Sequence, residues 1–400
     1  MLGLVVQPFY FILYWGFGAL CSGLNRQLRT FSILALSVGI LSTNFTRLFD
    51  FEFNSLRGMI ELGLYATAFY LFLLLAPTRS NFRKLWLFIG ITSVLLVLIL
   101  LKYESLAKTT TGLEIVKRDI LKILGISYLS FRLIHVLIDH YYDQLGEKTF
   151  LSFLAYFFFF PSALVGPIHR YQNFILDLKQ GSTISVSVFQ RIIIGLIKSL
   201  VLTSILFPYV LGQFEPYGQF ALLQLVFACM VYSVYIYLDF SGYTDIAIGV
   251  AQIVGVRLPE NFNKPFFAEN MQEFWQRWHM SLSSWLRDYL FNPVLKFLTE
   301  NRSGKISNPV FAIFFTFCLA GVWHGDGLNF LIFGILHGLG LALAMYRNRS
   351  KQKMKIEKSK SLTYFNRSLV FLYVSLAWIP FVYSWTEMLE LFQRLYMENH

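Results

Sequence analysis

His324 has a sequence setting suited to proton transfer. It follows the apolar run PVFAIFFTFCLAGVW and lies among Gly321, Gly325 and Gly327, which we expect to loosen the backbone and leave room for a ligand. A histidine has an unperturbed pKa near ~6.5, and low-dielectric surroundings keep its ring neutral and able to take a proton from a hydroxyl. The sequence therefore suggests His324 as a general base. A core histidine bonded to a neighbouring carbonyl fits the residues equally well.

His279 lies in a segment of unusual composition, EFWQRWHMSLSSWLRD at 273–288. On one helix over 273–290 the large apolar residues form a continuous face opposite two polar stripes. The apolar face consists of Phe274, Trp278, Leu282, Trp285 and Tyr289. The pattern predicts an amphipathic helix packed into a protein interior that holds water, or an interfacial anchor in which His279 is incidental. The preceding stretch 258–271 contains two prolines and is expected to be a structured connection.

A stripe of polar residues is predicted within the apolar run YSVYIYLDFSGYTDIAIG. Tyr232, Tyr235, Asp239 and Tyr243 follow at steps of three, four and four, so an unbroken helix presents them on one side. Asp239 is expected to accept hydrogen bonds from phenols or arginine, because an unpaired carboxylate at this depth is costly. Such a stripe either positions a substrate or supports a water-filled cavity, and the second interpretation is favoured.

Two further polar clusters lie in apolar surroundings. In GISYLSFRLIHVLIDH, Arg132, His135 and Asp139 share a helix face, which favours an internal ion pair over catalysis. In FFFFPSALVGPIHRYQNF, prolines and a glycine interrupt helix geometry just before His169 and Arg170, which predicts a broken helix at a membrane boundary. His169 beside Arg170 suits contact with an anionic group, and an interfacial histidine is the equal alternative.

The composition indicates what must position these residues. The chain has 400 residues, of which 56% are hydrophobic and 14% charged, and a mean hydropathy of +0.55, so it has too little polar surface for a soluble particle. A membrane helix needs ~20 apolar residues, which predicts roughly ten or eleven spans, several of them short or strongly tilted. The runs are 8–22, 31–45, 59–76, 85–101, 120–139, 149–166, 188–213, 218–240, 309–323, 326–345 and 366–385. We expect a single all-α domain over 1–400.

The net charge of +11 indicates topology rather than nucleic-acid binding, since the basic residues gather in short loops. The loop 346–362 contains RNRSKQKMKIEKSK and is predicted to be cytoplasmic, with the N-terminus outside and the first apolar run retained in a multi-pass protein of the cell membrane. The cysteines at 21, 229 and 318 lie in apolar runs without metal-like spacing, so we expect buried thiols and no metal site.

Several of these motifs together resemble one known family. YLDFSGYTDIAIG, PENFNKPF, EFWQRWHMSLSSWLRDYLF and GVWHG with a later LHG are similar to the membrane-bound O-acyltransferases, in the bacterial branch that O-acetylates alginate or moves D-alanine onto teichoic acids. The ordered motifs form a core from 125 to about 340, and GISYLSF and FFFFPSALVGPIHRY also fit. Each motif alone is modest, whereas the ordered set is specific.

The resemblance implies a ring of tilted helices around a central tunnel. It implies transfer of an acyl group from a cytoplasmic thioester, carried by coenzyme A or an acyl carrier protein, to hydroxyls of an extracytoplasmic polysaccharide or cell-wall polymer, directly or through a downstream acyltransferase. The family's histidine pair maps to His279 and His324, with His324 as general base and His279 orienting donor or acceptor. No tightly bound cofactor is implied. The expected supporting residues are Trp278, Ser281 and Arg287, and the expected wall residues are Asp239 and Tyr243.

The acyl group stays open at this point. SLSSWLRDYLFNPV is nearer the alginate-acetylating type, which slightly favours acetyl, but LKFLTENRSGK stands where that type has a Gly-Gly-Asn segment, and the short chain is nearer the D-alanyl type. Asp326, two residues after His324, has no counterpart in the motif. An ion or solute transporter would also bury Asp, His and Arg but predicts inverted repeats, and none is visible. A scaffold for a secretion complex is a third possibility.

Overall fold

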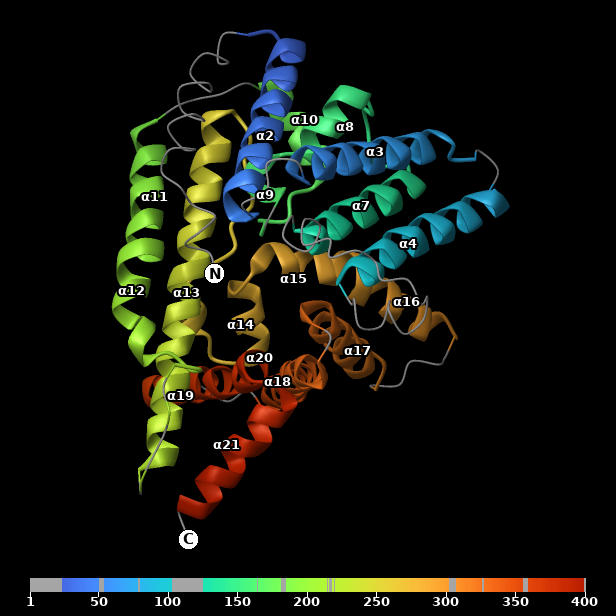
Figure 1. Cartoon of the computed structure of the whole chain (residues 1–400). Coiled ribbons are helices and arrows are strands. Elements are labelled where there is room, and N and C mark those ends of the chain that lie inside the picture. The colour runs from blue at the N-terminus through green and yellow to red at the C-terminus, as the bar shows by residue number, and fades with distance from the viewer. Residues whose placement is uncertain are drawn as a thin grey trace. The chain divides into compact units, whose positions relative to one another are not determined.

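Helices make up all the regular structure in the part of the chain that the computed structural model describes (Figure 1). The described residues are 24–49, 54–77, 80–102, 125–163, 165–180, 185–213, 215, 218, 220–301, 307–325, 327–354 and 359–398. The all-α prediction is confirmed for them. The chain forms two compact units, which are described separately: Met1–Leu196 with Tyr243–Pro259, called unit 1, and Ile197–Gly242 with Glu260–His400, called unit 2. The ring around a tunnel stays a prediction.

Five of the described helices are long and apolar enough to cross a membrane. They are Phe82–Lys102, Val186–Tyr209, Ala221–Ile253, Leu328–Arg347 and Lys360–Val382, with the shorter apolar helices Gly58–Leu74 and Pro309–His324. Seven predicted runs coincide with these helices, and the run 8–22 lies outside the described residues. Leu64, Phe88 and Leu343 are 65%, 67% and 67% exposed, as expected for side chains that face lipid. The chain is a multi-pass helical membrane protein.

Unit 1 contains the first eight described helices and the end of α13. They are α2 (Arg26–Phe49), α3 (Asn54–Leu74), α4 (Ser80–Lys102), α7 (Ile126–Tyr141), α8 (Phe150–Phe157), α9 (Phe160–Ala163), α10 (Tyr171–Gln180), α11 (Val186–Leu196) and α13 (Ala221–Ile253). Figure 1 shows α4 alongside α7. A Cβ at Gly90 would lie 3.0 Å from the Leu137 side chain, so this glycine permits the close approach.

The predicted span 149–166 is wrong as a single helix. α8 ends at Phe157, α9 has only four residues, and no helix covers 165–170. Proline cannot continue the backbone hydrogen bonds of a helix, and Pro161 and Pro167 both fall in this stretch, where Gly166 also has a φ of 89°. The prediction of a broken helix is therefore confirmed, and it leaves His169 and Arg170 on irregular backbone.

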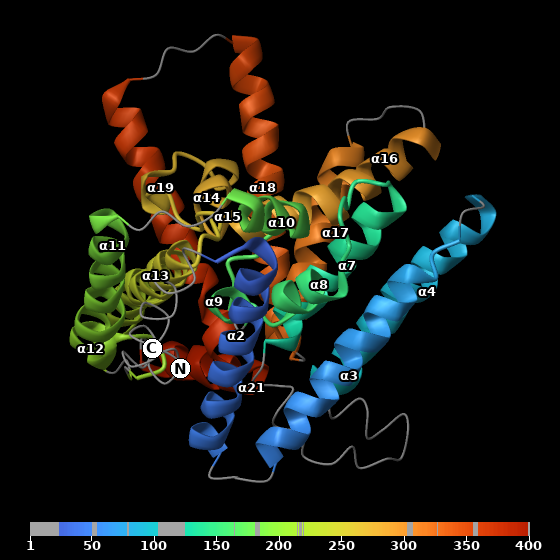
Figure 2. The ribbon, with the colours of Figure 1, turned by 90° about the horizontal axis from the view of Figure 1, so that it is seen from above.

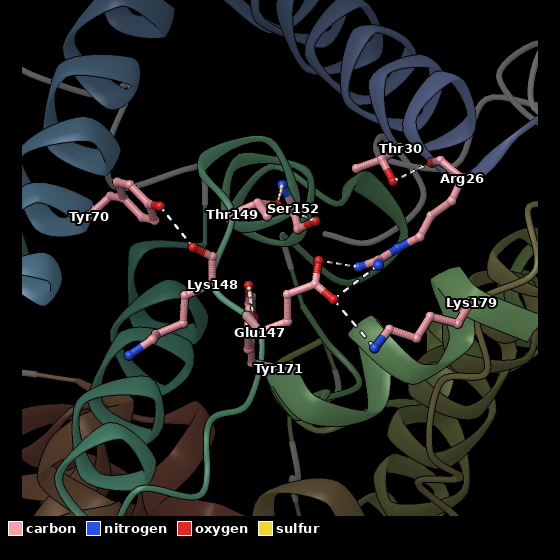
Figure 3. A network of polar contacts seen from close by, with 9 residues as sticks. All are labelled: Arg26, Thr30, Tyr70, Glu147, Lys148, Thr149, Ser152, Tyr171 and Lys179. Atoms are coloured by element: carbon pink, nitrogen blue, oxygen red, sulfur yellow. Dashed lines mark hydrogen bonds and ion pairs between the residues drawn. The ribbon is translucent and has the colours of Figure 1, made fainter.

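Side chains of three other helices, α2, α3 and α10, bind the connection between α7 and α8 (Figure 3). Arg26 of α2 donates two hydrogen bonds of 2.9 and 2.8 Å to the Glu147 carboxylate, and Lys179 of α10 forms an ion pair of 3.3 Å with it. The Tyr171 hydroxyl donates to the Glu147 carbonyl at 3.0 Å, and the Tyr70 hydroxyl donates to the carbonyl of the next residue at 2.9 Å. These contacts fix where α8 begins relative to α7 and α10.

Unit 2 contains the remaining elements and the first part of α13. They are a π-helix Ile197–Leu202, α12 (Thr203–Leu206), α14 (Met271–Arg277), α15 (Met280–Leu286), a π-helix Arg287–Phe291, α16 (Asn292–Asn301), α17 (Ser307–His324), α18 (Leu328–Met354), α19 (Lys360–Ala377), α20 (Ile379–Val382) and α21 (Trp385–Glu398), with 3₁₀ turns Phe207–Tyr209 and Pro265–Phe267. α14 packs against α18 (Figure 2). The predicted basic loop after residue 346 begins as helix, since α18 continues to Met354.

Gly321 has a packing role that the sequence interpretation missed. A Cβ at Gly321 would lie 2.4 Å from the Phe330 carbonyl oxygen and 3.0 Å from the Gly334 Cα, and a Cβ at Gly334 would lie 2.3 Å from the Phe317 carbonyl oxygen. The backbones of α17 and α18 therefore approach too closely for any side chain here. The glycine does not leave room for a ligand, because the neighbouring helix fills that space.

We expect Gly334→Ala to destabilise unit 2 by about 1–3 kcal/mol, because the added methyl forces α17 and α18 apart. Thermal unfolding of the detergent-purified protein measures the change. Gly63→Ala is the matched control, since nothing lies within 4 Å of its added Cβ in α3 and alanine is the better helix former. Equal unfolding temperatures for the two variants would contradict this packing argument.

Candidate functional site

The predicted helix over 273–290 is broken in the structure at Trp278 and His279. α14 ends at Arg277, Trp278 is extended with φ −107° and ψ 131°, and His279 is left-handed with φ 44° and ψ 51° before α15 begins at Met280. A left-handed residue with a side chain costs roughly 1–2 kcal/mol, so it persists only where its surroundings impose it. The prediction of one continuous helix is wrong, and the break lies at the histidine that the sequence singled out.

Asn261 holds the break in place from the preceding connection. Its carbonyl accepts from the Met280 N–H at 3.0 Å, and its side-chain oxygen accepts from the Ser281 N–H at 3.1 Å. The Asn263 N–H donates to the Arg277 carbonyl at 2.9 Å, so the last turn of α14 is satisfied as well. Asn261 is completely buried. The structured connection is confirmed, and Asn261 acts as a helix cap supplied by another segment.

We expect Asn261→Ala to lower stability by about 0.5–2 kcal/mol and to lower activity as well, because α15 loses its cap and His279 loses its support. Thermal unfolding and turnover are the two measurements. Asn263→Ala is the control, since Asn263 is exposed and contributes only backbone groups to the connection. The capping role would be refuted by an Asn261→Ala protein as stable and active as the Asn263→Ala protein.

His279 is a buried, neutral histidine. Its side chain is 5% exposed, and its ring meets the Phe240 ring edge-on with centroids 4.7 Å apart. Burial lowers the pKa of His279 to about 3, so the ring carries no charge at ordinary pH. A neutral imidazole has one N–H donor and one acceptor nitrogen, which suits it to orient a carbonyl or a hydroxyl.

His324 ends α17 and is half-buried among aromatic rings. Its ring centroid lies 4.7 Å from Trp323, 5.5 Å from Phe333 and 5.3 Å from Phe381. The apolar rings lower the local dielectric, while partial exposure leaves the imidazole reachable. Asp326, whose role the sequence left open, lies outside the described residues.

A chain of aromatic rings connects the two histidines within unit 2. Phe333 contacts Trp378 at 5.5 Å between centroids, and Trp378 contacts Trp278, the neighbour of His279, at 5.7 Å. His337 is 1% exposed and packs between Phe333 at 4.5 Å and Trp275 at 5.1 Å between ring centroids. Both candidate histidines therefore border one aromatic core.

A pocket of about 400 Å³ opens beside the broken helix in unit 2, within the size range of small-molecule sites. Its polar lining includes Gln272, Gln276, Ser283, Ser284, Arg287 and Thr316. The apolar lining includes Trp275, Met280, Phe317 and Leu341. Gln272, Gln276, Ser283 and Arg287 lie on the polar side of the segment 272–287, so this polar side faces a cavity.

Of the other predicted site residues, one lines the pocket and others support the break between α14 and α15. Arg287 is exposed, lines the pocket and pairs with Asp288 at 3.0 Å. Trp278 is 3% exposed and packs on Phe274, and the Ser281 N–H is used by Asn261, so both support the break. These residues are all in unit 2.

α13 carries the predicted tyrosine and aspartate stripe on one unbroken helix. Asp239 is half-buried in the unit 2 part, and the described residues donate no hydrogen bond to its carboxylate, contrary to expectation. The Tyr243 hydroxyl donates to the Pro161 carbonyl at 3.3 Å inside unit 1, which is a scaffold contact. Within the described residues no cluster of three or more metal-binding side chains occurs.

The helices and this site define a multi-pass membrane protein with two histidines bordering an aromatic core. The sequence model of the membrane-bound O-acyltransferase family matches residues 69–386, and the chain belongs to that family.

Several relatives in this family have descriptive names. The chain is 32% identical over 59% of its length to the teichoic acid D-alanyltransferase of Bacillus subtilis (strain 168), and 31% identical over 76% of its length to the probable alginate O-acetylase AlgI of Pseudomonas syringae pv. tomato. The aligned regions span 62% and 59% of these two relatives. The peptidoglycan O-acetyltransferase of Helicobacter pylori is 26% identical, with 84% of this chain and 69% of the relative aligned.

Proposed function

We propose that the protein is a membrane O-acyltransferase that moves an acyl group from a cytoplasmic thioester to hydroxyls of an extracytoplasmic polysaccharide or cell-wall polymer. The main support is the family match over residues 69–386, together with relatives named for alginate, teichoic acid and peptidoglycan. The half-buried His324 at the edge of the aromatic core supplies a side chain with the chemistry that this transfer needs.

In the proposed reaction His324 takes the proton of the acceptor hydroxyl while the oxygen attacks the thioester carbonyl carbon. The tetrahedral intermediate collapses with cleavage of the C–S bond, and the imidazolium returns its proton to the leaving thiolate. An ester and a free thiol result, without an acyl-enzyme. The neutral His279 orients the donor or the acceptor, and its N–H suits the developing oxyanion.

The pocket beside α14 and α15 suits the arm of a thioester donor. Its side-chain amides at Gln272 and Gln276 match amide groups along such an arm, and its apolar lining matches the methylene groups. A carrier protein or coenzyme A delivers the donor from the cytoplasmic side. This thioester is a co-substrate, and the reaction needs no tightly bound cofactor.

Acetyl is favoured over D-alanyl as the transferred group. A D-alanyl group carries an ammonium charge, and among the residues lining this pocket there is a cation, Arg287, but no carboxylate. An acetyl group has no charge to balance. D-alanyl transfer to teichoic acid is the second candidate, supported by the 32% identity with the Bacillus subtilis relative.

We further propose that the protein lies in the cell membrane with the N-terminus outside and the region 346–362 in the cytoplasm. The support is the run of basic residues there. The expected partners are the donor or its carrier protein inside, and the polymer or a downstream acyltransferase outside.

Mass spectrometry of the cell-surface polymer tests the proposed function. A strain with the gene is expected to carry ester-linked acetyl groups that disappear on deletion and return when the gene is restored on a plasmid. Loss of D-alanyl groups instead would establish the second candidate. An unchanged polymer, combined with altered uptake of an ion or solute, would favour a transporter and refute acyl transfer.

A further inference from the structure

Unit 1 contains an arginine whose charged group is almost completely buried. Arg132 in α7 is 1% exposed, and none of its three guanidinium nitrogens has a hydrogen-bond partner among the described residues. Its guanidinium lies over the Tyr156 ring at 4.3 Å from the centroid. A cation–π contact of this kind is worth up to about 2 kcal/mol, which does not replace the hydration of a buried cation.

The predicted ion pair between Arg132 and Asp139 does not form. The two residues lie seven positions apart on α7, which is about 10 Å along a helix axis and too far for direct contact. The Asp139 carboxylate instead accepts a hydrogen bond of 2.6 Å from the Gln172 side-chain amide. The prediction was wrong because a shared helix face does not bring groups two turns apart together.

His169 is a second buried polar side chain beside the same tyrosine. It is 1% exposed, and neither ring nitrogen has a hydrogen-bond partner among the described residues. Its backbone carbonyl accepts the Tyr156 hydroxyl at 2.6 Å, so the residue is held next to Tyr156. Burial, and then the charges of Arg132 and Arg170, lower the pKa of His169 to about 3, so the ring is a neutral donor and acceptor.

The neighbouring His135 has hydrogen-bond partners for both of its ring nitrogens. Its Nδ1 lies 3.2 Å from the Phe131 carbonyl, to which it donates, and its Nε2 accepts the Tyr171 N–H at 3.1 Å. Both ring nitrogens are thus used within the protein. Arg132 and His169 differ from His135, because the three guanidinium nitrogens of Arg132 and both ring nitrogens of His169 lack a hydrogen-bond partner among the described residues.

The orphaned groups share one chemistry. An arginine fork offers planar N–H donors that match the oxygens of phosphate, and a neutral histidine adds one more donor. Arg170, which is half-buried and adjacent to His169, adds positive charge, and the carboxylate of Asp139 on the same helix as Arg132 accepts a hydrogen bond from Gln172. We propose that Arg132 and His169, the Arg132–His169 cluster, bind the phosphate group of a ligand.

The elements around the cluster hold it in a fixed position. The cluster joins α7, α8 and the irregular backbone at 165–170, and the contacts of Glu147 in Figure 3 fix the connection between the first two. Tyr171 links that network to the cluster, because its hydroxyl donates to the Glu147 carbonyl and its ring packs on Tyr156 at 5.2 Å. The cluster is thus preorganised, and its residues all lie in unit 1, so phosphate binding there does not depend on acyl transfer.

Thermal unfolding of the purified full chain with inorganic phosphate, against chloride at equal ionic strength, tests the proposal. Phosphate is expected to raise the unfolding temperature of the wild type in a saturable way, because it binds only the folded state. In Arg132→Met an apolar side chain replaces the unpaired cation. This variant is expected to unfold at or above the wild-type temperature without phosphate, and to lose the phosphate response at least ten-fold in apparent affinity.

Two further variants make the test decisive. Arg29→Gln removes another buried arginine of unit 1, whose side chain donates to the Asp177 carbonyl, and should keep the phosphate response. His169→Phe keeps an aromatic ring without polar atoms and should weaken the phosphate response. This variant also tests the proposal if Arg132→Met does not fold. The proposal is overturned if phosphate does not stabilise the wild type, or if Arg29→Gln loses the response as fully as Arg132→Met.

The same assay identifies the source of the phosphate. Phosphopantetheine and glycerol 3-phosphate, each added in place of inorganic phosphate, represent the arm of a thioester donor and the phosphate of a polymer or lipid. If either compound raises the unfolding temperature of the wild type and Arg132→Met abolishes this effect, the result supports phosphate binding by the cluster. The compound that binds with the higher apparent affinity then identifies the source of the phosphate. If deletion of the gene leaves the polymer unchanged while phosphate still binds, the cluster stands and the proposed acyl transfer fails.

Discussion

Replacing His324 by alanine is expected to lower acyl transfer by a factor of about 10²–10⁴, the usual contribution of a positioned general base. The acceptor hydroxyl then keeps its proton during attack on the thioester, while the fold is retained because His324 is only half-buried at the end of α17. The measurement is transfer of a labelled acyl group from a thioester to polymer in membranes that contain equal amounts of protein.

His337→Phe is the matched control for His324→Ala. It removes a second imidazole that borders the same aromatic core, packed between Phe333 and Trp275, and a phenyl ring fills similar space. We expect this variant to keep most of the activity. If His324→Ala transferred the acyl group at the wild-type rate, the general base would have to be another residue. A secretion scaffold would likewise be unaffected by His324→Ala, so the experiment separates an enzyme from a scaffold.

The membrane-spanning helices could be predicted from the sequence because hydrocarbon imposes a length and an apolar composition on each of them. The runs 85–101, 218–240 and 366–385 each fall on a helix of spanning length. The run 149–166 has the same composition, but it contains Pro161 and is followed by Pro167. These prolines predict a break, and the structure shows that the run divides into α8 and α9. The apolar composition identified a segment that lies in the membrane, whereas the prolines determined that the segment is not one continuous helix.

The two histidines of the candidate site could be identified by residue type, but their local geometry could not. Positions 273–290 satisfy helical periodicity throughout, and that pattern is unchanged whether the helix is continuous or broken at His279. The break depends on Asn261, eighteen residues earlier, which replaces the hydrogen bonds that the helix gives up. Likewise the role of Gly321 depends on Gly334 in the next helix.

The left-handed backbone at His279 permits a prediction that separates its backbone role from its imidazole role. His279→Gly adopts φ 44° without strain, whereas His279→Ala retains the cost of roughly 1–2 kcal/mol of a left-handed residue with a Cβ. Both variants lose the contact between the imidazole and the Phe240 ring. We therefore expect His279→Gly to unfold at a higher temperature than His279→Ala, as measured by thermal unfolding of the purified proteins.

Activity should not follow stability in this pair. If the imidazole orients the donor or acceptor, both variants lose roughly 10²-fold in transfer rate, because a misplaced reactant loses its near-attack geometry. A His279→Asn variant tolerates the same backbone conformation and keeps a polar group, so partial recovery in it would indicate that one hydrogen bond suffices. Should His279→Gly transfer acyl groups as fast as the wild type, the histidine would be needed for neither chemistry nor orientation, and the catalytic pair would reduce to His324 alone.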